Sequence, residues 1–199
     1  MKCLLKRTKS SNHPSQPVKK EVMNNNNNKK TPHQTFEDMI HYIVFKWEGG
    51  DRVHTVAGDP GGTTKYGISQ RANPNVDIAN LTWEQAIEIY RDEYWTRIQG
   101  ENWSPGIALI ALDAAVNQGP GDAIEFLQVS ARTSVDGIIG KNTIAAVKAK
   151  DKLDFIEEYA ARRGEDYTEI NRAQLNRFGL GWMRRLMDIY REALVADGL

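Results

Sequence analysis

The chain has 199 residues, 40% of them apolar, and carries 26 acidic and 26 basic side chains. This length suits one domain or a small catalytic part with a helper, and the apolar share is sufficient for a buried core. Its apolar stretches are shorter than a membrane span, so stable membrane insertion is not expected. A single cysteine, Cys3, excludes an intrachain disulfide.

The first residues differ from the rest of the chain in charge. Residues 1–35 hold eight Lys or Arg and one acid, whereas the remainder holds 18 basic and 25 acidic side chains. With the run Asn24 to Asn28 and little to bury, residues 1–34 are predicted to be a disordered basic tail. Its apolar run Cys3-Leu4-Leu5 is too short for a secretory signal, so we expect synthesis in the cytosol.

Order is expected to begin near residue 36. Residues 36–47 place apolar side chains at helical spacing, and Gly49-Gly50 is expected to end that helix. Residues 51–70, rich in Gly, Thr and Val, are predicted to form short strands and tight turns.

From residue 81 onward the pattern is helical. Thr82 and Gln85 form a capping box that opens a helix to about residue 98. Ser104 as N-cap with Pro105 starts a helix over about 105–117, which is apolar enough to run through the core. Further helices are expected at about 122–131, 141–149, 152–163, 166–177 and 181–196. The predicted class is therefore mainly α with a small β element.

Glu48 is the first candidate for chemistry. It follows an apolar helix, adjoins Trp47 and precedes two glycines that leave space for a bulky substrate. A carboxyl group that Trp47 and the core partly desolvate would favour its protonated form and act as a general acid. The alternative is a solvated or capping glutamate, which is the commoner role at a helix end.

A turn after this helix supplies a second polar position. Asp59-Pro60-Gly61-Gly62 makes a sharp reversal and Thr63-Thr64 favours a strand, so Asp59 or Thr64 is a candidate to face Glu48 across a cleft. There it would hold a water or stabilise positive charge on a sugar. The alternative is a hairpin in which these side chains only satisfy turn amides.

Several motifs in order resemble one known family. The run Glu48-Gly49-Gly50 with Asp59-Pro60-Gly61-Gly62-x-Thr64-x-Tyr66-Gly67-Ile68-Ser69 is similar to the signature of glycoside hydrolase family 108, lysozyme-like N-acetylmuramidases that include phage endolysins. The similarity continues through residues 77–82 and 89–95. The stretches 113–121, 135–143 and 181–185 resemble the peptidoglycan-binding region that usually follows.

This resemblance implies both a fold and a set of roles. The implied fold is a lysozyme-like α+β catalytic region over residues 35–112 with a small β-hairpin, followed by a helical peptidoglycan-binding region over 113–197 packed on it. The implied catalytic residues are Glu48 as general acid with Asp59 and Thr64. The implied substrate-binding residues are Tyr66, Trp95, Gly61 and Gly62.

The resulting hypothesis is a muramidase that cleaves the glycan strand between N-acetylmuramic acid and N-acetylglucosamine. We expect a monomer that acts at the cell wall or periplasm after release or export, with the glycan strand as its partner. The four histidines show no ligand spacing, so neither a metal nor another cofactor is expected. Nucleic acid is not expected as a partner, because no aromatic is interleaved with the tail lysines and the body is acidic. A lytic transglycosylase and a non-catalytic wall-binding or secretion-assisting protein remain alternatives.

Overall fold

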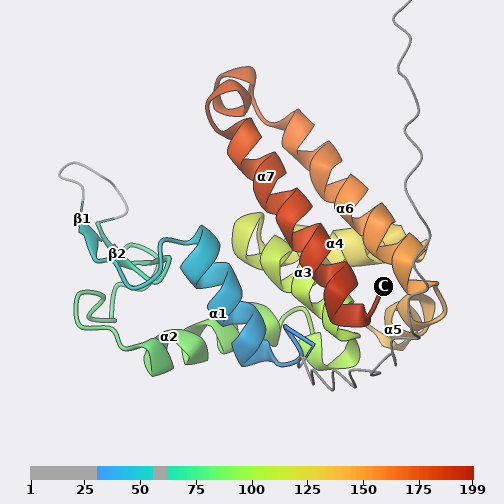
Figure 1. Ribbon diagram of the computed structural model, residues 1–199, viewed down its shortest axis with the longest axis horizontal. Coiled ribbons are helices and arrows are strands. Elements are labelled where there is room, and N and C mark those ends of the chain that lie inside the picture. Colours follow the sequence, from blue (N-terminus) through green and yellow to red (C-terminus); the bar gives the residue numbers. More distant parts are fainter. Residues whose placement is uncertain (1–30, 56–61) are drawn as a thin grey trace, which may run out of the picture. The chain divides into compact units, whose positions relative to one another are not determined.

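The computed structural model describes residues 31–55 and 62–199, which belong to the unit Thr31–Leu199. Its strands are β1 (His54–Thr55), β2 (Thr63–Lys65) and β3 (Ile68–Ser69). Its α-helices are α1 (Phe36–Trp47), α2 (Trp83–Tyr90), α3 (Pro105–Asn117), α4 (Pro120–Ala131), α5 (Lys141–Lys148), α6 (Lys152–Glu169) and α7 (Arg172–Asp197). This confirms the mainly α class with a small β element, and with helices filling the C-terminal region (Figure 1).

Helix α3 forms the centre of the core. Every residue from Gly106 to Ala115 is buried, as the apolar sequence predicts. Helices α1, α4, α6 and α7 all pack against it. The α3–α7 crossing is especially tight, because a Cβ atom at Gly106 would lie 2.2 Å from the carbonyl oxygen of Ala193.

The three short strands form one antiparallel sheet in the order β1-β2-β3. His54 pairs with Thr64 and Lys65 pairs with Ile68, so only two residues connect β2 to β3. The sheet lies beyond the C-terminal end of α1 (Figure 1). The chain that leaves α1 therefore returns close to the end of that helix.

The structure revises several predicted helix boundaries. The capping box of Thr82 and Gln85 is present, but the α-helix ends at Tyr90 and continues as one π-helical turn, Arg91–Trp95. The two predicted C-terminal helices, 166–177 and 181–196, are wrong: α6 extends to Glu169, and α7 runs unbroken through Gly179 and Gly181. Helix α7 as a whole packs against α3 and α6, and its continuity outweighs the low helix propensity of two glycines.

The start of α3 is also capped differently from the prediction. Ser104 makes no side-chain cap and instead donates its hydroxyl to Asp197 at 2.6 Å. The second carboxylate oxygen of Asp197 accepts from the backbone amide of Gly106 at 3.0 Å. A carboxylate from the end of α7 therefore satisfies the positive end of α3.

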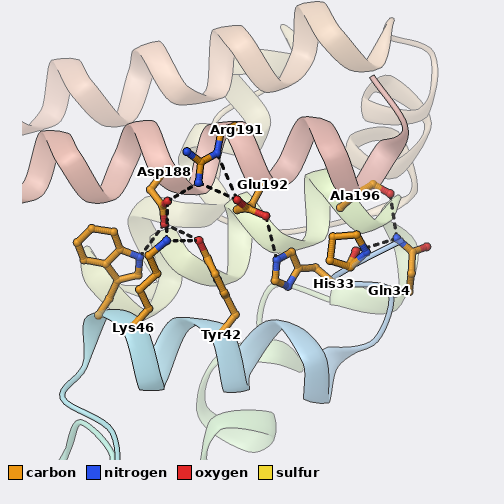
Figure 2. Close-up of polar contacts among 10 residues, drawn as sticks. His33, Gln34, Tyr42, Lys46, Asp188, Arg191, Glu192 and Ala196 are labelled. Carbon is orange, nitrogen blue, oxygen red and sulfur yellow. Dashed lines mark hydrogen bonds and ion pairs between the residues drawn. The ribbon is translucent and has the colours of Figure 1, made fainter. Parts of the chain in front are cut away.

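The described chain is ordered before the predicted start at residue 36. His33 is buried and contacts Glu192 at 3.3 Å, and Gln34 donates to the carbonyl oxygen of Ala196 (Figure 2). Most of the predicted tail, residues 1–30, lies outside the described residues. Within the described residues, no helix has both the length and the apolar character needed to cross a membrane.

A polar clasp joins α1 to α7. The carboxylate of Asp188 accepts from Tyr42 at 2.6 Å, Lys46 at 2.7 Å and Trp47 at 3.2 Å (Figure 2). Burial alone would raise the pKa of Asp188, but the hydrogen bonds from Lys46, Tyr42 and Trp47 outweigh it and hold the pKa below its ordinary value of 3.8. We call this set, Asp188 with its three donors on α1, the α1–α7 clasp.

We predict that Asp188→Asn destabilises the protein by about 1–3 kcal/mol, because charged acceptors make stronger hydrogen bonds than amides. Urea unfolding at pH 7 measures this. The depressed pKa means that the contribution is present above the unfolded-state value and is lost as pH falls through the lower folded-state value. The difference between parent and variant should therefore shrink near pH 3.

Glu165→Gln is the matched control for this prediction. Glu165 pairs with Arg162 on the exposed surface of α6, where such a pair is worth about 0–1 kcal/mol. Equal losses of stability in the two variants would show that the clasp contributes no more than a surface ion pair.

Candidate functional site

Glu48 lies where α1 ends and the chain turns toward the sheet. Its backbone amide and that of Gly50 both donate to the carbonyl oxygen of Val44 at 3.1 Å. Gly49 and Gly50 have φ values of 87° and 64°, a left-handed conformation that suits glycine and ends the helix. None of the described residues has an atom within 4 Å of the position where Gly49 would carry a Cβ atom, so with respect to them the backbone beside Glu48 borders open space.

The carboxylate of Glu48 is the outer end of a chain of charges. Its Oε1 atom accepts from Arg185 Nη1 at 2.5 Å, and its side chain is 23% exposed. Arg185 Nε in turn donates to Asp113 Oδ1 at 2.9 Å, and Nη2 makes an ion-pair contact with the same oxygen. Asp113 Oδ2 accepts from Arg163 at 2.8 Å. We call Glu48, Arg185, Asp113 and Arg163 the charge chain.

The charge chain leads from the surface into the core. Asp113 and Arg163 have fully buried side chains. Gln118 supports Arg163 by accepting from its Nε atom at 2.8 Å. Burial alone would lower the pKa of Arg185, but the carboxylates of Asp113 and Glu48 outweigh it and raise that pKa, so the guanidinium stays charged.

This surrounding differs from the one predicted for Glu48. The sequence suggested an apolar pocket beside Trp47, whereas the carboxylate contacts a guanidinium and Trp47 donates to Asp188. Sequence reasoning did not assign Arg185, Asp113 or Arg163 to the site. One signal was present: an aspartate inside the apolar helix 105–117 requires a buried counter-charge.

The β2–β3 turn approaches Glu48 from the other side. Its two residues, Tyr66 and Gly67, have φ values of 53° and 77°, as a two-residue hairpin turn requires. Tyr66 is held in this unusual conformation by two hydrogen bonds: its amide donates to Gly50 at 2.9 Å, and its carbonyl accepts from the Tyr90 hydroxyl at 2.7 Å. The turn is therefore tied both to the end of α1 and to α2.

Two tyrosines complete the surroundings of Glu48. Burial, followed by the charge of Glu48, raises the pKa of Tyr90 well above its ordinary value. Burial and the charges of Glu48 and Glu93 likewise raise the pKa of Tyr94, whose ring lies 5.4 Å from that of Tyr90. Both phenols therefore stay protonated and present neutral groups to the carboxylate.

The structure places the other predicted site residues as follows. Thr64 lies on β2 and is half-buried. Because adjacent side chains of a strand point to opposite faces, the side chain of Thr64 lies on the face opposite to that of Thr63 and Lys65. Gly62 has φ +69° and begins the approach to β2. Tyr66 is buried, and its ring packs 5.3 Å from that of Trp83. Asp59 and Gly61 lie outside the described residues.

Trp95 lies far from Glu48. Its ring packs 5.1 Å from that of Phe36, at the other end of α1, and its Nε1 donates to Glu101. Since α1 has 12 residues, its two ends are about 18 Å apart. Trp95 borders a separate cavity of about 340 Å³. Among the described residues, no group of three or more His, Cys, Asp or Glu side chains is arranged to hold a metal.

Two family models match different parts of the chain. Residues 41–119 match the family model for glycosyl hydrolase 108, and residues 122–187 match a model described as a predicted peptidoglycan domain. These two matches confirm the resemblance to glycoside hydrolase family 108 and its peptidoglycan-binding region. Together they indicate a lysozyme-like glycoside hydrolase that acts on peptidoglycan. Of the charge chain, Glu48 and Asp113 lie in the glycosyl hydrolase 108 region, and Arg163 and Arg185 in the peptidoglycan domain.

A solved structure has a similar fold. The structure of SagA from Brucella abortus matches with a TM-score of 0.69 and 29% sequence identity, over 80% of this chain and 93% of that one. A comparison with curated proteins finds no match.

We predict that Gly67→Ala disturbs the site directly. A Cβ atom there would lie 2.7 Å from the Tyr90 hydroxyl and 2.8 Å from Glu48 Cβ, at a φ that disfavours alanine. The expected destabilisation is about 2–4 kcal/mol, the sum of backbone strain and a collision, measured by urea unfolding.

Gly137→Ala separates these two terms. Gly137 has a similar φ of 72°, but no atom of the described part of the chain lies within 4 Å of its Cβ position, so this variant carries the strain without the collision. If Gly67→Ala costs no more than Gly137→Ala, the tight approach of the turn to Glu48 is refuted.

Proposed function

We propose that this protein cleaves the glycan strand of peptidoglycan between N-acetylmuramic acid and N-acetylglucosamine, with Glu48 as the general acid. The observation that carries the proposal is a partly buried carboxyl group, fixed at a helix end, beside open space at Gly49. The matches to the glycosyl hydrolase 108 model and to the peptidoglycan domain support the substrate. The protein would act at the cell wall as a monomer, after release or export.

The chemistry requires two functions around the cleaved bond. An acid protonates the departing sugar oxygen. Positive charge develops on the remaining sugar ring, and a carboxylate or a water that it orders must stabilise or attack that ring from its other face. Glu48 supplies the first function. We assign the second to Asp59 or Thr64, because Thr64 lies on the strand that leads into the Tyr66–Gly67 turn next to Glu48.

The remaining assigned residues would contact the substrate in different ways. The backbone of the turn at Tyr66 borders the site, whereas the buried ring of Tyr66 supports it from beneath. Gly61 and Gly62 would allow close approach of the strand to the backbone. Trp95 packs on Phe36 at the opposite end of α1 from Glu48, so it would contact only a sugar remote from the cleaved bond.

We expect Glu48→Gln to clear walls at least about 100-fold more slowly than the parent, since general acid catalysis contributes 10²–10⁴-fold. Turbidity of purified cell walls measures this. Glu37→Gln is the matched control, because Glu37 lies on the same helix, is exposed and pairs with Arg91. If Glu48→Gln clears walls as fast as the parent, Glu48 is not the general acid.

The products decide between related reactions. New reducing muramic acid ends support a muramidase, whereas new reducing glucosamine ends would identify a glucosaminidase. An anhydro end, lighter by one water, would identify a lytic transglycosylase. If the parent binds walls and releases no product, the protein is a wall-binding or secretion-assisting protein.

A further inference from the structure

The charge chain crosses between the two family regions at every step. Glu48 contacts Arg185, Arg185 contacts Asp113, and Asp113 contacts Arg163. Members of the glycosyl hydrolase 108 region thus alternate with members of the peptidoglycan domain. The carboxyl group proposed as the acid is therefore held by a side chain from the domain expected to bind the wall.

The geometry of Arg185 suits it to orient a carboxyl group. Its guanidinium is planar and uses two different edges, with Nη1 directed at Glu48 and Nε at Asp113. Its side chain is only 7% exposed. Because Asp113 is buried and is also held by Arg163, the guanidinium has a fixed plane. A lysine has one ammonium group and cannot reproduce two such directions.

The contact uses only one oxygen of Glu48. Arg185 binds Oε1, and Oε2 has no hydrogen-bond partner among the residues that the structure describes. A protonated carboxyl group can accept a hydrogen bond at one oxygen and donate from the other. The arrangement therefore leaves Oε2 as the oxygen that donates.

We propose that Arg185 is a positioning residue that holds Glu48 through Oε1 and aims Oε2 at the glycosidic oxygen, so that the peptidoglycan domain completes the catalytic site. The proposal rests on Glu48 being the general acid. Under this proposal the peptidoglycan domain contributes to the rate of turnover as well as to wall binding, and the two contributions can be measured separately. A misplaced acid costs rate even where the substrate still binds.

The experiment measures kcat and KM on soluble glycan strands, and wall binding by co-sedimentation, for Arg185→Ala, Arg185→Lys and the control Arg184→Ala. Arg184 is the exposed neighbour on the same helix. For both Arg185 variants we expect kcat to fall about 10–100-fold, while KM and wall binding stay within about twofold. Arg184→Ala should keep the parent kcat.

Chemical rescue separates positioning from folding. Adding guanidinium ion at tens of millimolar should restore part of the kcat of Arg185→Ala and leave Arg185→Lys and the parent unchanged. Circular dichroism establishes that each variant is folded before it is assayed. Arg185→Lys retains the charge beside Asp113 and is the variant to use if the alanine variant unfolds.

Defined outcomes would overturn the proposal. A folded Arg185→Ala with parental kcat, or a variant that loses wall binding while keeping kcat, contradicts a positioning role. If neither variant folds, Arg185 is a structural residue only. Failure of the proposed function looks different, because Glu48→Gln would then be as active as the parent, or the parent would release no product.

Discussion

The buried ion pair between Asp113 and Arg185 is the contact on which the site depends. Asp113 lies within a helix that is otherwise built of small and aliphatic side chains, and its own side chain has no exposed surface. A buried carboxylate is stable only when it is paired and hydrogen-bonded, and here Arg163 and Arg185 each bind one oxygen of Asp113. This requirement brings α6 and α7 onto α3 and leaves one edge of Arg185 for Glu48.

A second contact, between α1 and α7, lies nearer the surface. Asp188, three residues beyond Arg185, accepts hydrogen bonds from three side chains of α1. These bonds fix the position of the C-terminal half of α1 against α7. Helix α7 thus locates the backbone that carries Glu48 as well as its carboxyl group. The division into two family regions therefore describes the sequence rather than two separate bodies, because the working end of the first is built against the last helix of the second.

The sequence predicted features that depend on neighbours along the chain. The apolar stripe of α1, the capping box at Thr82 and the burial of α3 all follow from local spacing, and each is present. Predictions failed where distant contacts decide. Gly179 and Gly181 do not interrupt α7, and Ser104 contacts Asp197 instead of capping α3.

For the candidate site, too, the sequence predicted the residue that local position marks and missed those that distant packing adds. Glu48 was predicted as a candidate from its position at a helix end and from the family resemblance. Arg185 could not be assigned, since it is 137 positions from Glu48, and only the packing of α7 on α3 brings the two together. The presence of Asp113 in an apolar helix indicated that a partner must exist, but helical periodicity does not say which of 26 Lys and Arg side chains it is.

Alternating buried charges also restrict how such a sequence can diverge. Replacing Asp113 alone leaves Arg163 in the core without its counter-charge, a loss of about 3–5 kcal/mol that is comparable to the whole stability of many domains. Exchanging Asp113, Arg163 and Arg185 together for apolar residues of similar volume can be nearly neutral, yet every path that removes Asp113 before Arg163 passes through a buried unpaired charge. Substitutions at these positions of α3, α6 and α7 are therefore expected to occur together.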